Sequence, residues 1–138
     1  MGLLNKLFKP KQVVDSSDVV KTIDYKGGTK FASNETNNVY VDIEELGGFP
    51  YLKTTIIGDI SVKIKRKGCN ITFKFKDSDI QLDSDNTTVE SSQIKQTNAF
   101  FTLIDFELNE DEAKKIKKGR VKEVVYNFNG NDFSFKPI

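Results

Sequence analysis

The feature that most constrains this chain is an alternation of apolar and polar residues over 124–135, on both sides of Asn129-Gly130. Asn-Gly favours a type I′ turn, because both central residues of that turn need a positive φ. Counting back from the turn places Tyr126 opposite Phe133 on one apolar face. A lone two-stranded ribbon is only marginally stable in water, so this pattern predicts a hairpin that packs on a larger core.

A second hairpin is predicted in the middle of the chain, where residues 62–75 alternate in the same way around Gly68-Cys69. Glycine at the first central position is what a type II′ turn requires. The predicted register places Ile64 opposite Phe73 on an inward apolar face.

Further strands are predicted wherever short apolar runs are bounded by Gly, Asn and Asp. With the two hairpins they give about eight or nine strands. The fold class predicted is all-β, mainly antiparallel, and both a β-sandwich and a partly open barrel remain open. The additional strand candidates are 19–25, 39–43, 53–57, 80–82 and 100–108, and the intervening turn-rich pieces are 26–29 and 32–38.

One short helix is predicted near 109–118. Asn109 is a good N-cap, Glu112 completes a capping box at the third helical position, and Gly119 ends the helix. Ala113 and Ile116 are its core-facing candidates, so we expect the helix to cover one end of a sheet.

Length and composition indicate one domain in a reducing compartment. The chain has 138 residues, of which 37% are hydrophobic, and this is enough to close a core without disulfides or metal. Its single cysteine, Cys69, excludes an internal disulfide. No stretch approaches the length of a membrane span or matches a signal peptide, and a cytoplasmic location is expected. We expect an amphipathic segment at 1–10 and one strand-rich domain at 11–138.

The composition argues against catalysis. Histidine is absent, and no phosphate loop or dinucleotide fingerprint occurs. The acidic stretch 77–86 lacks the spacing of an EF-hand and is interpreted as turn capping. We therefore predict no catalytic residue, no cofactor and no metal site. A carboxylate-based enzyme is the less favoured possibility, since two strand carboxylates could still converge in space.

Lysines gather on the outer face of the predicted middle hairpin. Lys63 would lie directly opposite Lys74, with Lys65 beside them. Such like-charge pairs are unfavourable unless an anion or an acidic neighbour offsets them. The acidic strand around Ile80 supplies such a neighbour, so a solvated, charge-balanced face is the favoured interpretation. Nucleic acid is an unlikely partner, because the aromatic residues of this hairpin are expected to point inward.

The segment 46–52 combines two glycines and a proline with the aromatic residues Phe49 and Tyr51 and with Leu52. Gly-Gly and Pro predict an irregular loop here. Exposed, it would be a binding loop, whereas folded back it would close one end of the domain. Burial is the favoured alternative, because exposed apolar patches are costly.

At the N-terminus, Leu4 and Phe8 share one face of a short helical turn with further leucines, and lysines lie beside them. Packing on the chain's own domain is favoured. Contact with a membrane surface is the alternative, although so short a segment would bind lipid weakly.

The function predicted is that of a non-catalytic cytoplasmic protein-interaction or accessory domain, which binds another protein or its own copy. The candidate contacts are an exposed face, a strand edge or the 49–52 segment. The alternative is a peripheral membrane-surface module that combines the N-terminal turn with the lysine face. The candidate interaction residues are Phe49, Tyr51, Leu52, Lys63, Lys65, Lys74, Leu4 and Phe8.

Overall fold

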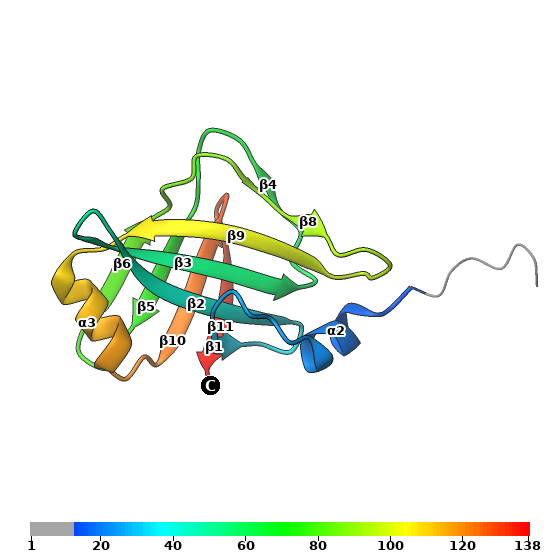
Figure 1. Ribbon diagram of the computed structural model, residues 1–138, viewed down its shortest axis with the longest axis horizontal. Coiled ribbons are helices and arrows are strands. Elements are labelled where there is room, and N and C mark those ends of the chain that lie inside the picture. The colour runs from blue at the N-terminus through cyan, green and yellow to red at the C-terminus, as the bar shows by residue number, and fades with distance from the viewer. Residues whose placement is uncertain (1–12) are drawn as a thin grey trace, which may run out of the picture.

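The computed structural model describes residues 13–138, which form a strongly curled antiparallel sheet with two short helices (Figure 1). The helices of this described part are α2 (Ser16–Thr22) and α3 (Glu110–Lys118). Its strands are β1 (Thr29–Ser33), β2 (Asn37–Leu46), β3 (Phe49–Gly58), β4 (Lys63–Ile64), β5 (Asn70–Lys74), β6 (Asp79–Asp83), β7 (Val89–Glu90), β8 (Ser92–Gln93), β9 (Phe100–Glu107), β10 (Glu123–Phe128) and β11 (Asn131–Pro137).

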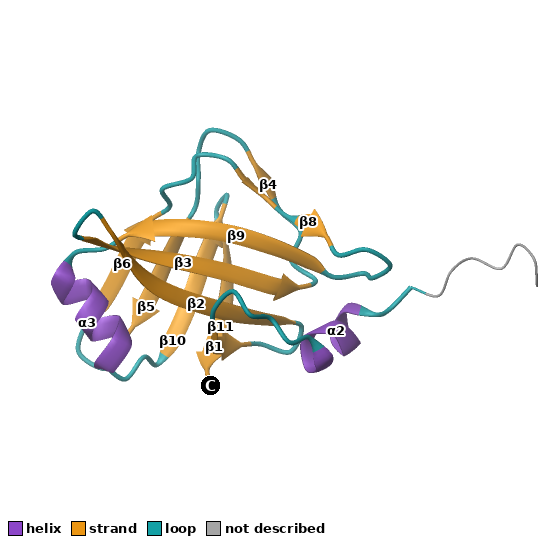
Figure 2. Cartoon of the chain, viewed as in Figure 1, coloured by secondary structure: helices purple, strands orange, loops and turns teal. Residues whose placement is uncertain are grey.

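Nine of these strands form one sheet in the order β6-β5-β10-β11-β1-β2-β3-β9-β8, and β4 pairs separately with β7. The sheet curls into a half-barrel (Figure 2). Its two sides approach each other at one place, where Ser84 bridges to Phe106 and the Asp85 N–H donates to the Asp105 carbonyl at 2.7 Å. The all-β prediction is confirmed, and the partly open barrel is the alternative that the chain adopts.

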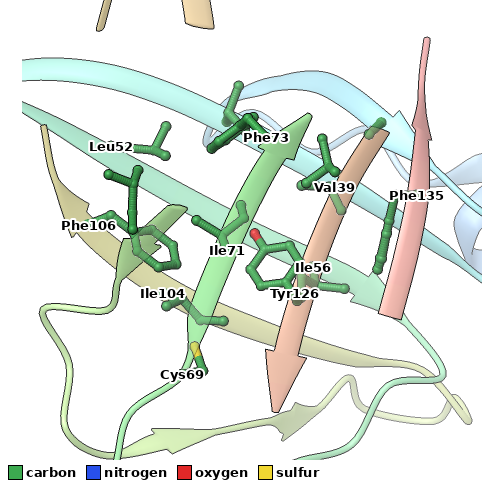
Figure 3. Close-up of a cluster of buried hydrophobic side chains, with 14 of the residues drawn as sticks. Val39, Leu52, Ile56, Cys69, Ile71, Phe73, Ile104, Phe106, Tyr126 and Phe135 are labelled. Carbon is green, nitrogen blue, oxygen red and sulfur yellow. The ribbon is translucent and has the colours of Figure 1, made fainter. Parts of the chain in front are cut away.

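Alternate residues of the long strands point into the half-barrel and fill it. Figure 3 shows Phe73, Phe106, Tyr126 and Phe135 converging from four strands, and each of these side chains is almost completely buried. Tyr126 lies 6.5 Å from Phe106 and 5.9 Å from Phe135, measured between ring centroids. These distances suit tilted aromatic contacts, so the interior is a packed core.

The predicted C-terminal hairpin is confirmed. Tyr126 pairs with Phe133 in the ladder between β10 and β11. Asn129 and Gly130 have φ values of 54° and 89°, as a type I′ turn requires. This element follows from local sequence, because its turn residues satisfy their backbone geometry without help from the rest of the chain.

The predicted helix near 109–118 is also confirmed. The Asn109 side chain accepts from the Glu112 backbone N–H at 2.7 Å, and the Glu112 carboxylate accepts from the Asn109 N–H at 2.9 Å. This reciprocal pair is a complete capping box. Ala113 and Ile116 are buried in the main core, and the helix lies at one end of the curled sheet (Figure 1).

The predicted hairpin at Gly68-Cys69 is wrong. Ile64 in β4 pairs with Val89, while β5 lies between β6 and β10. Gly68 does have a positive φ of 63°, but its N–H donates to the Thr87 carbonyl at 2.9 Å instead of closing a two-residue turn. A strand with neighbours on both sides satisfies more backbone groups than a lone ribbon, and this long-range pairing overrides the local pattern.

The predicted strand at 19–25 is wrong as well, because its first residues belong to α2. Val19 and Ile23 are four residues apart, a spacing that places both on one side of a helical turn. They pack on the outward face of the sheet against Ile57 and Ala99. The apolar pattern therefore serves a helix covering the sheet, not a further strand. The two turn-rich pieces are shorter than predicted. Thr29 belongs to β1, and of the piece 32–38 the first two residues belong to β1 and the last two to β2.

Candidate interaction surface

The segment predicted to be an irregular loop is a regular hairpin tip. β2 and β3 pair along their whole length, ending at Leu46 opposite Phe49, with Gly47 and Gly48 forming the turn at φ values of 61° and 85°. Pro50 fits the strand because its carbonyl faces β9, where it accepts from the Leu108 N–H. Its missing N–H lies on that same side, so no bond to β2 is lost.

The tip exposes large apolar side chains. The side chain of Phe49 is 75% exposed and that of Leu46 is 59% exposed, and the two lie opposite each other across the turn. Tyr51 is half-buried beside them on the same outward face, whereas Leu52 points into the core and is fully buried. Burial of the whole segment, the favoured alternative, therefore holds for Leu52 and not for Phe49.

A shallow hollow of about 410 Å³ lies at this tip. It joins the hairpin to the end of β9, because Tyr51 pairs with Glu107 in the sheet. We call these outward residues of the hollow and the adjacent Glu44 the tip surface. Its members are Glu44, Leu46, Phe49, Tyr51 and Glu107.

The surroundings of the tip surface are acidic. Asp42 and Asp105 lie on the same outward face. Each is two residues further from the tip than Glu44 or Glu107 on its own strand. Lys53 lies between the two acidic strands, and its ammonium is 3.4 Å from the carboxylate of Glu44. The outward face of β2, β3 and β9 near the tip therefore carries an excess of negative charge.

These carboxylates affect the titration of their neighbours. Partial burial, followed by the nearby carboxylate of Asp105, raises the pKa of Tyr51 to about 12. Hydrogen bonding to Glu44, two residues along the same face, raises the pKa of Asp42 above its ordinary value. Both shifts show that a further negative charge is disfavoured here, at Asp42 mainly through Glu44 and at Tyr51 through burial and then Asp105.

The predicted lysine face does not assemble. Lys63 lies on β4, 3.8 Å from the carboxylate of Glu90, and Lys74 lies on β5, 3.6 Å from that of Glu123. The prediction that Lys63 faces Lys74 is wrong, because their strands are not paired with each other. Lys65 is exposed in the loop that follows β4.

The acidic neighbour predicted for these lysines is present, since β6 pairs with β5 and places Asp79 opposite Lys74. The candidate residues Leu4 and Phe8 lie outside the described residues. Sequence reasoning found Phe49 and Tyr51, included Leu46 in the same segment without naming it as a contact, and missed Glu44 and Glu107. Gly47-Gly48 between two alternating runs was the available signal for Glu44.

The remaining reactive groups are enclosed in the core. Burial raises the pKa of the Cys69 thiol to about 11, so little of the nucleophilic thiolate is present near neutral pH. The buried hydroxyl of Tyr126 has no hydrogen-bond partner within residues 13–138 (Figure 3). Burial raises the pKa of this phenol as well. Tyr126 is completely buried, and only 9% of Cys69 is exposed.

Among residues 13–138, His, Cys, Asp and Glu form no group of three or more that could bind a metal ion. In the same part of the chain, no helix has the length and apolar character needed to cross a membrane. Comparison with known protein families, curated proteins and solved structures finds no match for this chain.

Proposed function

We propose that this chain is a non-catalytic protein-interaction domain that binds a basic, apolar segment through its tip surface. The observation that carries the proposal is the exposed pair Leu46 and Phe49, held at the end of a hairpin and surrounded by carboxylates. Large apolar side chains on a rigid element are typical anchors for a partner.

The charge distribution supports a basic partner. Glu44 and Glu107 flank the aromatic residues, and Asp42 and Asp105 extend the negative charge along the sheet. A partner with lysine or arginine next to leucine or phenylalanine would place its apolar groups in the hollow and its cations over these carboxylates. Such complementarity contributes more to association rate and specificity than to affinity.

The non-catalytic part of the proposal is supported by the chemistry of the titratable groups. The sequence has no histidine, and the Cys69 thiol is buried with a raised pKa. Asp42 and Glu44 are neighbouring carboxylates, but they lie on the exterior of the sheet, where solvent screens them. A carboxylate enzyme would need such a pair inside a water-excluding cleft.

The experiment is selection of a displayed random peptide library on the immobilised full chain. We expect the selected peptides to combine Lys or Arg with large apolar residues and to bind more weakly as salt rises. Affinity is expected to fall about tenfold or more for the double variant Leu46→Ser/Phe49→Ser, the effect of losing an apolar anchor. Ile138→Ser is the matched control, because Ile138 is equally exposed at 72% but lies outside the tip surface.

Two results would contradict the proposal. One is a set of selected peptides without net positive charge, and the other is equal loss of affinity in Ile138→Ser and the double variant. Binding of the wild-type chain to phosphatidylserine vesicles, lost when residues 1–10 are removed, would support the membrane-surface alternative instead. The pairing of Lys63 and Lys74 with carboxylates weakens that alternative.

A further inference from the structure

We infer that the segment bound by the tip surface is the N-terminal segment, residues 1–12, of a second copy of this chain. The inference rests on the proposed function, because it names the partner of the same surface.

The N-terminal segment has the chemistry that the tip surface lacks. Residues 1–12 contain three leucines and Phe8 together with Lys6, Lys9 and Lys11, and they contain no carboxylate side chain. The tip surface offers the reverse arrangement, a largely apolar hollow that is lined in part by Glu107 and has Glu44 beside it, opposite Tyr51. Apolar groups of the segment fit the hollow, and its lysines match the surrounding negative charge.

The two surfaces lie at opposite ends of the molecule. Val14 pairs with Thr97, just before β9, and β9 begins opposite Gly58. From Gly58, β3 runs ten residues to Phe49, which corresponds to about 30 Å at the rise of a β-strand. The N-terminal end of the described chain and the hairpin tip accordingly lie on opposite sides in Figure 1.

This separation favours a second copy over the chain's own tip. Phe8 is five residues from Val13, and a fully extended chain of that length spans about 17 Å. Leu7 reaches only one residue further. Leu3 and Leu4 could approach the tip of the same copy only through a fully extended chain of nine or ten residues, about 30–35 Å long, and Phe8 and Leu7 would then lie well short of the hollow. A neighbouring copy has no such limit and can bring Phe8 and the leucines to the tip together.

Each copy would then contribute a segment to one contact and a tip surface to another. Such a contact is heterologous, so it produces open chains or rings unless two copies exchange their segments. If the segment is blocked on one copy and the tip surface on the other, assembly should stop at a pair. A general loss of stability in either variant would not produce such a pair.

The test uses the variants Phe8→Asp and Phe49→Asp in the full chain, with masses measured by sedimentation velocity at increasing protein concentration. We expect the wild-type chain to self-associate, and to do so less at high salt. Each variant alone should be monomeric. An equimolar mixture should form a one-to-one pair, since one intact tip surface and one intact segment remain. Ile138→Asp is the control and should associate like the wild type.

A second measurement uses a fluorescent synthetic peptide of residues 1–12, titrated into the Phe8→Asp chain. Binding that weakens about tenfold or more when Phe49→Asp is added supports the inference. Equal binding to both chains overturns it, because the segment would then bind elsewhere on the domain. A wild-type chain that remains monomeric at every concentration also overturns it.

The two proposals fail differently. If the peptide of residues 1–12 does not bind but basic peptides from the random library still need Phe49, only the inference about the partner is wrong. If neither kind of peptide depends on Phe49, the proposed function of the tip surface is wrong as well.

Discussion

The outward face of β2, β3 and β9 carries large apolar side chains at both ends, but those at one end are buried and those at the other are exposed. At one end Tyr40 and Ile57 are buried, because α2 and the segment before β9 pack over them. At the other end Leu46 and Phe49 stay exposed, and carboxylates surround them. Within residues 13–138, no helix or loop covers Leu46 and Phe49 as α2 covers Tyr40 and Ile57.

The contrast separates apolar residues that stabilise the fold from those that we propose bind a partner. Residues at the covered end exclude water in the folded chain and should contribute to the free energy of unfolding. Leu46 and Phe49 stay mostly exposed, so folding gains little from their apolar surface, and the proposed contact with a partner would account for it. Four substitutions test this division.

The largest effect is expected at the covered end. Ile57→Ala removes a side chain that is 1% exposed and packs with Val19, Tyr40 and Ala99. We expect a loss of about 2–5 kcal/mol in the free energy of unfolding, from lost burial and the cavity left behind. Urea denaturation followed by circular dichroism measures it. A loss below about 1 kcal/mol would show that α2 does not seal this end.

A smaller effect is expected at the border between the two ends. The Tyr25 hydroxyl lies 2.9 Å from the Thr55 hydroxyl, and its ring contacts Tyr40 with centroids 5.0 Å apart. Tyr25→Phe keeps the ring contact and removes the hydrogen bond, so we expect a loss of about 1 kcal/mol. A double-mutant cycle with Thr55→Val checks the assignment. Strictly additive losses would mean that the two hydroxyls do not interact.

The third prediction concerns charge near the tip. Because the pKa of Asp42 is raised in the folded chain, the folded state binds this proton more tightly than the unfolded state does. The stability that Asp42 contributes should therefore decrease as pH rises through and above the ordinary value of 3.8. Asp42→Asn should be more stable near neutral pH by a few tenths of a kcal/mol, the size expected for exposed charges. This gain should vanish in acid. Denaturation curves across pH measure it, and an equal gain in acid would contradict the cause given.

The smallest effect is expected at the tip itself. Phe49→Ser should change the free energy of unfolding by less than about 0.5 kcal/mol, because the side chain is 75% exposed. The same urea denaturation applies, with Ile57→Ala as the comparison. A loss as large as that of Ile57→Ala would show that Phe49 packs in the folded chain, and the division between the two ends would fail.

The candidate surface could be predicted only in part. Phe49 and Tyr51 stand out in the sequence as aromatic residues beside two glycines and a proline. Their exposure depends on whether the segment is a loop or a strand, since alternation assigns Tyr51 outward and Leu52 inward only within a strand. Glu107 joins them solely because β9 pairs with β3, a contact between distant parts of the chain.

Two glycine turns differ in how far the local sequence predicts them. At Asn129-Gly130 the turn and the register of the hairpin depend on residues at most eleven positions apart, and both were predictable. The helix cap at Asn109 depends on Glu112, three positions away, and was predictable for the same reason. At Gly68 the backbone also has a positive φ, yet the partners of its segment are Thr87 and Ser84. Local turn preferences amount to about 1 kcal/mol, and the burial and hydrogen bonding of a central strand outweigh them. Local sequence therefore predicts the C-terminal hairpin and the capped helix. Pairing across the whole sheet sets which strands are neighbours and which apolar residues remain exposed.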